Sequence, residues 1–255
     1  MPNRLLCSVA GAVVAGAFGV GSASAALVTY DIVQAQSTLT LGGNLTGNTA
    51  SQQTAGSLTT SYTGTIVANR TAGNIEFPGG SVIDAALQPT NQQPRADATP
   101  GSAPADYGRT APGPFFSTAL EAFRGMILDV FDDTSGLGST VNASGQFASQ
   151  NLILQIDSGE SDVAYGNATA ENDLSGRGTS NGATTASTVI TSGGVETLTL
   201  RFNTGAIVYG VSQSGDSSIT FNGTIVATRN VVIPEPTGLA ALAAGSLLLA
   251  RRRRA

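Results

Sequence analysis

The feature that most constrains the fold of this 255-residue chain is a succession of short segments rich in Val, Ile, Thr, Tyr and Phe. Gly, Asn, Asp and Ser separate these segments, as is typical of turns between strands. In 38–41 and 197–200, Thr and Leu alternate strictly, which indicates a strand with one buried face and one hydrated face. The sequence therefore predicts an all-β fold, as an antiparallel β-sandwich or jelly-roll-like single domain. The predicted strands are 27–33, 37–41, 58–68, 74–84, 151–156, 187–191, 196–202, 206–211 and 218–229.

Three segments depart from this pattern. Apolar residues recur at helical spacing over 117–130, which predicts a short helix. This helix would run into a strand at 126–131. Residues 88–114 contain six prolines and few apolar residues, which predicts a long Pro-rich surface loop. The polar segment 167–185 predicts a second loop or an irregular edge.

Composition excludes most catalytic chemistry. The chain has no His and no Trp, all 12 basic residues are Arg, and Cys7 is its single cysteine. Catalytic triads, zinc centres and Schiff-base chemistry need the residue types that are missing. Between Arg4 and Arg251, seven Arg stand against 17 acidic residues, so this region carries a charge near −10 and repels nucleic acid. We expect neither an enzyme nor a nucleic-acid partner.

One catalytic route remains open, because glycoside hydrolysis needs only two carboxyl groups at a suitable separation. Aromatic residues make up only 5% of the chain, which argues against the aromatic platforms common in polysaccharide sites. Nothing in the sequence selects a pair of carboxylates. The candidates are Glu76, Glu121, Glu160, Glu171 and Glu196.

The first 25 residues have the pattern of a secretory signal peptide. Arg4 supplies the positive charge, and 5–20 is an uncharged, largely apolar segment. Ala23 and Ala25 are the small residues that a signal peptidase requires for a cut before Ala26. A first membrane-spanning helix is the alternative, but the apolar segment is short for that role. We expect a signal helix that is removed, together with the single cysteine.

Residues 231–255 also combine an apolar segment with positively charged residues. Pro234, Glu235 and Pro236 precede 237–250, an uncharged, Ala- and Leu-rich segment that predicts a hydrophobic helix. At about 1.5 Å per residue, its fourteen residues span roughly 21 Å, less than a hydrocarbon core of about 30 Å. By the positive-inside rule, the arginines that follow stay in the cytoplasm. These arginines are Arg251, Arg252, Arg253 and Arg254.

This order of features resembles the PEP-CTERM sorting signal of bacteria that make extracellular polysaccharide. The resemblance covers only the last 25 residues. It implies transient anchoring in the inner membrane and removal of the tail near the Pro-Glu-Pro motif by an exosortase, a membrane-embedded cysteine transpeptidase. The implied destination is the cell surface or the extracellular matrix. A plain single-span anchor is the alternative, although such anchors are ordinarily longer.

The remaining domain, 26–230, contains no motif that assigns a ligand. We expect a non-catalytic exported surface or extracellular-matrix protein, with signal peptidase and exosortase as its processing enzymes. Extracellular polysaccharide or envelope components are the expected contacts after export. The alternatives are a carbohydrate-active module that binds or cleaves exopolysaccharide, and an assembly module that uses exposed strand edges.

An internal repeat relates two parts of this domain at an offset of 159 residues. Segment 38–41 matches 197–200, and Gly64 to Ala68 matches Gly223 to Ala227 without a gap. The repeat predicts a duplicated hairpin whose copies share one sheet system and place Ile66 and Ile225 in the core. Convergence of a Thr-rich β composition is the alternative.

Calcium is the one candidate cofactor. Asp157, Glu160 and Asp162 surround Gly159, and carboxylate oxygens suit a hard cation. The spacing lacks the further ligands of an EF-hand loop, so solvated turn residues are the preferred interpretation and no cofactor is expected. A second acidic group comprises Asp129, Asp132 and Asp133.

Overall fold

The computed structural model describes residues 25–71, 73–89, 104–113, 117–133, 138–165, 168–211 and 215–231. The helices predicted for the signal peptide and for 237–250 lie outside these residues, as does most of the Pro-rich segment. Across the ranges just given, no helix has the length and apolar character needed to cross a membrane.

The described chain is almost entirely β-structure, which confirms the all-β prediction. A 3-10 turn, η1 (Gln34–Gln36), follows the first strand. The first strands are β1 (Ala26–Ile32), β2 (Thr38–Gly42), β3 (Asn44–Leu45), β4 (Asn48–Thr49), β5 (Ser51–Gln52), β6 (Thr59–Arg70), β7 (Asn74–Glu76), β8 (Val82–Ala85), β9 (Tyr107–Pro112) and β10 (Thr118–Asp132). The later strands are β11 (Ser139–Thr140), β12 (Gln146–Phe147), β13 (Leu152–Tyr165), β14 (Ala168–Asp173), β15 (Arg177–Ser180), β16 (Ser187–Ser192), β17 (Val195–Asn203), β18 (Ile207–Val211) and β19 (Gly215–Asn230).

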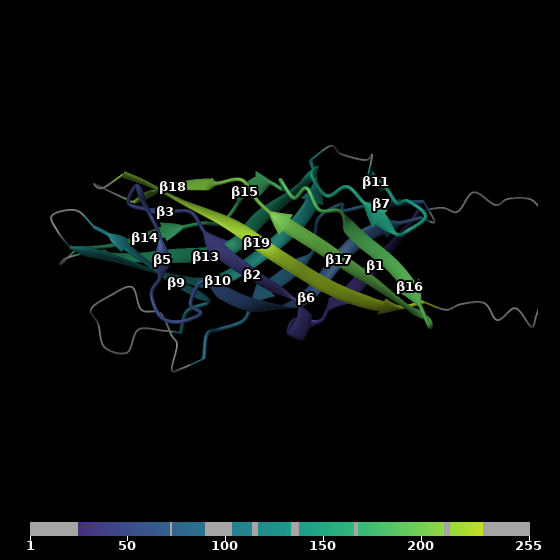
Figure 1. Cartoon of the computed structure of the whole chain (residues 1–255), viewed down its shortest axis with the longest axis horizontal. Helices are drawn as coiled ribbons and strands as arrows, with labels where there is room; N and C mark the ends of the chain where they lie inside the picture. Colours follow the sequence, from purple (N-terminus) through teal and green to yellow (C-terminus); the bar gives the residue numbers. More distant parts are fainter. Residues whose placement is uncertain are drawn as a thin grey trace, which may run out of the picture.

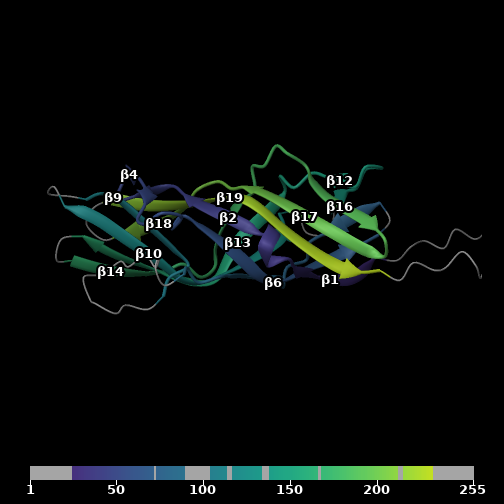
Figure 2. The same cartoon turned by 60° about the horizontal axis from the view of Figure 1, so that its bottom comes forward.

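These strands pair in antiparallel fashion, and nearly all of them belong to one continuous sheet. β1 and β2 each pair with both β6 and β19. From β6 the sheet continues through β8 to β10 and β13, and from β19 it continues through β17 to β16. A bridge between Asn181, after β15, and Thr204, after β17, joins the two outer parts. The sheet thus wraps into an elongated molecule with two layers (Figures 1 and 2).

One apolar core lies between the layers. Leu39 and Leu41 of β2 are fully buried, whereas Thr38 and Thr40 are exposed, which confirms the predicted alternation. Leu, Ile, Val, Phe and Tyr side chains from both layers join the same cluster. Burying each large apolar side chain contributes about 1.5–3 kcal/mol, so this core is the main stabilising term.

The helix predicted over 117–130 is wrong, because this segment is the long strand β10. Its pairing with β13 shifts register after Arg124, at a bulge where Gly125 has a φ of 61°. Before the bulge the odd-numbered residues, such as Phe123, are buried, and after it the even-numbered residues, such as Met126, are buried. This change of phase within one strand imitates helical spacing.

The predicted loop 88–114 and the segment 167–185, predicted as a loop or an irregular edge, also contain strands. β9 lies within 88–114, between β10 and the short β5. β14 and β15 lie within 167–185 and both pair with β13. Their sequences concealed them, because none of the three strands contains Val, Ile, Leu or Phe. The predicted strand 74–84 is in fact two strands, β7 and β8, separated by a turn.

The sequence repeat has a structural counterpart in β6 and β19. Ile66 and Ile225 are both fully buried, as predicted. Gly64 and Gly223 occupy equivalent positions and have positive φ angles of 108° and 151°. A Cβ there would lie 2.0 Å and 2.2 Å from a carbonyl oxygen of a neighbouring strand, so both positions require glycine.

The two copies share one sheet but not an equivalent hairpin. Thr38 pairs with Ser61 in the first copy. In the second copy Thr197 pairs with Thr228, whereas the offset would place it opposite Thr220. The repeat therefore preserves the long strands and their glycine bends, and the pairing within each hairpin differs.

Candidate functional site

The predicted signal cleavage site falls at the edge of the folded domain. Ala25 and Ala26 are exposed, and Ala26 begins β1 opposite Arg70 of β6. The other predicted processing residues lie outside the described residues. They are Ala23, Pro234, Glu235, Pro236, Arg251, Arg252, Arg253 and Arg254.

The first strand begins and the last strand ends at the same pole of the elongated domain (Figure 1). Ala26 of β1 pairs with Arg70, and Asn230 of β19 pairs with Val195 of β17. Glu196, the next residue of β17, forms ion pairs with both Arg70 and Arg229. One carboxylate therefore links β19, on which the domain ends, to β6, the strand that pairs with β1.

Glu196 is the centre of the terminal cluster, which comprises Tyr30, Arg70, Thr191, Glu196 and Arg229. Tyr30 donates a 2.6 Å hydrogen bond to Glu196 Oε1, and Arg229 Nε and Nη2 each lie 2.7 Å from this oxygen. Arg70 Nε lies 3.6 Å from Oε2, which accepts a 3.2 Å hydrogen bond from Thr191. The side chains of Arg70, Glu196 and Arg229 are 13%, 6% and 22% exposed. The cluster thus lies at the rim of this pole of the domain, where its side chains are partly hydrated.

The environment of this rim keeps Glu196 ionised. Burial raises the pKa of Glu196, but hydrogen bonds from Tyr30 and Arg229 and the charges of the two guanidinium groups hold it below its ordinary value. Burial and the neighbouring carboxylate raise the pKa of Tyr30 well above its ordinary value. The tyrosine therefore remains a neutral donor to a charged acceptor.

A second cluster of similar chemistry, the buried cluster, comprises Arg109, Glu121, Phe123, Ser161 and Tyr209. Arg109 donates 2.6 Å hydrogen bonds from Nε to Glu121 Oε2 and from Nη2 to the Tyr209 hydroxyl. Tyr209 and Ser161 each donate a 2.5 Å hydrogen bond to Glu121 Oε1. The side chains of Arg109 and Glu121 are 0% exposed. This ion pair is sealed from water and from substrates, so its role is structural.

Sequence reasoning missed the buried cluster because it assigned Arg109 to a loop. The alternation of Tyr107, Arg109 and Ala111, all buried on β9, is the signal that could have revealed a strand here. A lone arginine in such an alternation needs a buried carboxylate. Glu121, on the neighbouring strand directly opposite Arg109, supplies it.

Two of the calcium candidates lie on a carboxylate-rich face of β13 and β14. Glu160 pairs with Asp173, and Asp162 pairs with Glu171. Directly opposed residues share a face, so like charges face each other across these strands. Arg124 of β10 forms an ion pair with Asp162 and offsets part of this repulsion.

The third candidate, Asp157, lies earlier on β13 and accepts a 3.2 Å hydrogen bond from Gln155 of the same strand. All three carboxylates therefore lie along a strand, and none lies in a turn or a calcium loop. Within the ranges that the structure describes, no group of three or more Asp, Glu, His or Cys residues is arranged to hold a metal ion.

The second acidic group holds the turn between β7 and β8. Asp129 accepts 2.8 Å hydrogen bonds from the backbone N–H groups of Gly80 and Ser81. Asp132 accepts a 2.6 Å hydrogen bond from the N–H of Phe77. These carboxylates satisfy backbone donors that the turn would otherwise leave unpaired.

Four of the candidate glycosidase carboxylates fall into two groups, one in ion clusters and the other in an open hollow. Glu121 and Glu196 are centres of separate ion clusters, whereas Glu160 and Glu171 line one hollow of about 550 Å³ together with Asp173. None of the residues that line this hollow is aromatic. Hydrogen bonds from Ser175 lower the pKa of Asp173, which favours its ionised form. The hollow thus places carboxylates together without an aromatic platform for a sugar ring.

No family model, no curated protein and no solved structure matches this chain.

Proposed function

We propose that this chain is an exported, non-catalytic surface or extracellular-matrix protein that is sorted through its C-terminal tail. An exosortase would cut the tail near Pro234–Pro236 after the apolar segment has held the protein in the inner membrane. The observation that carries this proposal is the order of the tail: a Pro-Glu-Pro motif, an apolar segment and four arginines. Each part has its own physical role in retention or recognition.

The position of the domain boundary supports this proposal. β19 ends at Asn230, and the Pro-Glu-Pro motif begins at Pro234. A cut at the motif would leave every described strand within the released domain. The terminal cluster holds the end of β19 through Arg229, within the domain that such a cut would release.

The arrangement of the two ends also supports presentation at a surface. β1 begins and β19 ends at one pole, whereas β14 and β18 lie towards the opposite end of the long axis (Figure 1). A domain held in the membrane by its tail would therefore project that opposite end away from the membrane. We propose that the two layers form a sandwich of the kind used by many exported modules.

Intact-mass measurement of protein recovered from the native bacterium tests this proposal. We expect a mass that begins at Ala26 and ends near the Pro-Glu-Pro motif. Glu235→Gln should leave the tail attached and hold the protein in the membrane fraction. Glu171→Gln, which neutralises an exposed carboxylate of β14, is the matched control and should be processed normally. A wild-type mass that still includes Arg251–Arg254 would overturn the proposal.

A further inference from the structure

An apolar patch is exposed near the pole where β1 begins and β19 ends. Its three aliphatic side chains are Leu27 of β1, which is 66% exposed, Ile190 of β16, which is 50% exposed, and Val195 of β17, which is 37% exposed. They are half of the six large apolar side chains that are exposed among the described residues. Single exposed apolar side chains are common, but three near one pole are a surface feature. We call these three residues the terminal patch.

Strand register places the terminal patch on one outer face of the sheet. Ile190 lies opposite Thr197 of β17, and β19 connects Thr197 to Asp31 of β1 in the same row across the strands. Directly opposed residues share a face. Val195 is two residues from Thr197, and Leu27 is four residues from Asp31, so both also point to this face. The patch is therefore part of one surface.

The chain itself limits how far this surface can lie from a membrane that holds the tail. Six residues, 231–236, separate the end of β19 from the apolar segment 237–250. At no more than about 3.6 Å per residue, they span at most about 22 Å. The N–H of Val231 donates a 2.8 Å hydrogen bond to the carbonyl oxygen of Gly194, in the turn between β16 and β17. The chain therefore leaves the domain beside the terminal patch.

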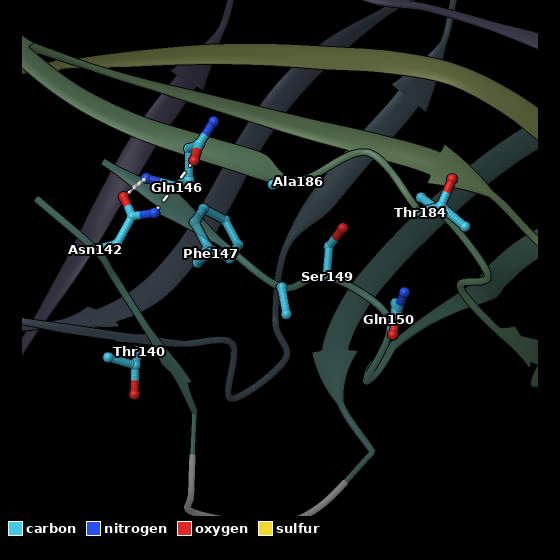
Figure 3. A pocket seen from close by; sticks show the side chains of 10 residues that line it. Thr140, Asn142, Gln146, Phe147, Ser149, Gln150, Thr184 and Ala186 are labelled. Atoms are coloured by element: carbon cyan, nitrogen blue, oxygen red, sulfur yellow. Dashed lines mark hydrogen bonds between the residues drawn. The ribbon is translucent and has the colours of Figure 1, made fainter. Parts of the chain in front are cut away.

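The surroundings of the patch suit the interface of a bilayer better than its hydrocarbon core. Beside β16, hydroxyl and amide side chains such as Asn142, Gln146 and Thr184 line a hollow in which no lining residue is charged (Figure 3). On β1, the exposed Asp31 bounds the patch at about 13 Å from Leu27 along the strand. Aliphatic side chains bordered by uncharged polar groups match the boundary between lipid headgroups and acyl chains.

We propose that the terminal patch rests on the lipid surface of the membrane that holds the tail. This inference rests on the proposed function, because it needs the tail as an anchor. A lipid surface fits the patch better than a second copy of the chain does, since the tail keeps the patch within about 22 Å of the bilayer at all times. Burial of the aliphatic side chains among the headgroups stabilises the contact. The contact orients the elongated domain and holds the Pro-Glu-Pro motif where a membrane-embedded enzyme acts.

Tryptophan fluorescence tests the inference, because the chain contains no tryptophan. Ile190→Trp and Val195→Trp each place one reporter in the patch. Val208→Trp, at a position of β18 that is 54% exposed and lies towards the opposite end, is the matched control (Figure 1). The full chain, with its tail intact, is reconstituted into phosphatidylcholine vesicles that contain lipid brominated near the headgroup, and is recovered by flotation. We expect the brominated lipid to quench both patch reporters about twofold, because they lie at the headgroup boundary, and to leave the control unchanged. Equal emission from the patch and control reporters would overturn the proposal.

A second substitution tests whether the apolar character of the patch causes the contact. Val195→Glu, combined with Ile190→Trp, should reduce quenching to the level of the control, whereas Val208→Glu in the same background should not. A patch reporter that is blue-shifted, unquenched and sensitive to the protein-to-lipid ratio would assign the patch to a second copy and overturn the inference. If the chain floats with the vesicles but the reporters stay unquenched, only this inference fails. If the chain does not float, the tail is no anchor, and the proposed function fails with it.

Discussion

The terminal cluster and the buried cluster have nearly the same chemistry but different surroundings. In each, a tyrosine donates to a glutamate, an arginine pairs with the same glutamate, and the guanidinium lies over an aromatic ring. The distance from the guanidinium carbon to the ring centre is 5.3 Å for Arg229 over Tyr30 and 5.2 Å for Arg109 over Phe123. The clusters differ in their access to water and in the number of cations.

This difference indicates how each cluster contributes to stability. Glu121 depends on a single arginine, and both are 0% exposed, so loss of one partner leaves a charge stranded in the core. Glu196 has two arginines at a partly hydrated rim, so loss of one partner is compensated by the other and by water. The buried cluster is intolerant of change, whereas the terminal cluster is redundant.

Arg109→Met is expected to have the largest effect. It leaves Glu121 buried without its cation, and breaking such a pair costs about 3–5 kcal/mol of unfolding free energy. The measurement is urea unfolding, followed as a shift in the midpoint at constant slope. Arg201→Met, at an exposed position of β17, is the control and should cost less than about 0.5 kcal/mol. Equal costs for the two substitutions would contradict the comparison.

Asp106 is a buried carboxylate that forms no ion pair with an arginine among the described residues, and it sharpens the comparison through pH. Burial raises its pKa from 3.8 to about 6, although a 2.9 Å hydrogen bond from the Met126 N–H opposes this rise. The folded state then binds the proton more tightly than the unfolded state. Stability contributed by this group is present below about pH 4 and is lost as pH rises to about 6, by roughly 3 kcal/mol.

Asp106→Asn should remove this dependence, because the amide oxygen can still accept from Met126 and carries no charge. We expect the variant to be more stable than the wild type at neutral pH by about 1–3 kcal/mol. The measurement is the free energy of unfolding at several pH values between 4 and 7. Parallel curves for the two proteins would show that Asp106 does not titrate in this range.

How far the sequence predicts these features depends on the length scale over which they are encoded. Alternating Thr and Leu predict β2 and β17 correctly, because the alternation that marks a half-buried strand involves residues close together in the sequence. The Gly125 bulge and the burial of Arg109 depend on the neighbouring strands β13 and β10. A local sequence pattern does not predict which strands pair. The role of Asn181 is hidden for the same reason, because its side chain donates hydrogen bonds to the carbonyl oxygens of Ser149 and Arg201 on two other segments.

Glu196→Gln should have a smaller effect than the loss of Arg109. The glutamine keeps hydrogen-bonding capacity but removes the charge that the two arginines share, so we expect a loss of about 1–2 kcal/mol at neutral pH and low salt. Added salt should reduce this difference because the rim is partly hydrated. Unfolding curves at low and high salt provide the measurement, and a loss that is unchanged by salt would argue that the carboxylate is effectively buried.

The same variant tests the pKa of Glu196. Its folded-state pKa lies below the ordinary value of 4.5, so its contribution is present above that value and is lost as the pH falls through the folded-state pKa. The wild type should therefore lose stability in acid more steeply than Glu196→Gln. Asp106 acts in the opposite direction over a higher range, so the double variant Asp106→Asn, Glu196→Gln should have the flattest profile.

Tyr30→Phe is expected to have the smallest effect. It removes one hydrogen bond to Glu196 Oε1, but Arg229 still donates to that oxygen, so the cost is about 0.5–1.5 kcal/mol. Tyr209→Phe is the matched change in the buried cluster, where Arg109 Nη2 loses its acceptor and water cannot replace it. We expect that change to cost about 1–3 kcal/mol, measured by the same urea unfolding. Equal costs for the two substitutions would contradict the idea that hydration of the rim makes the terminal cluster more tolerant.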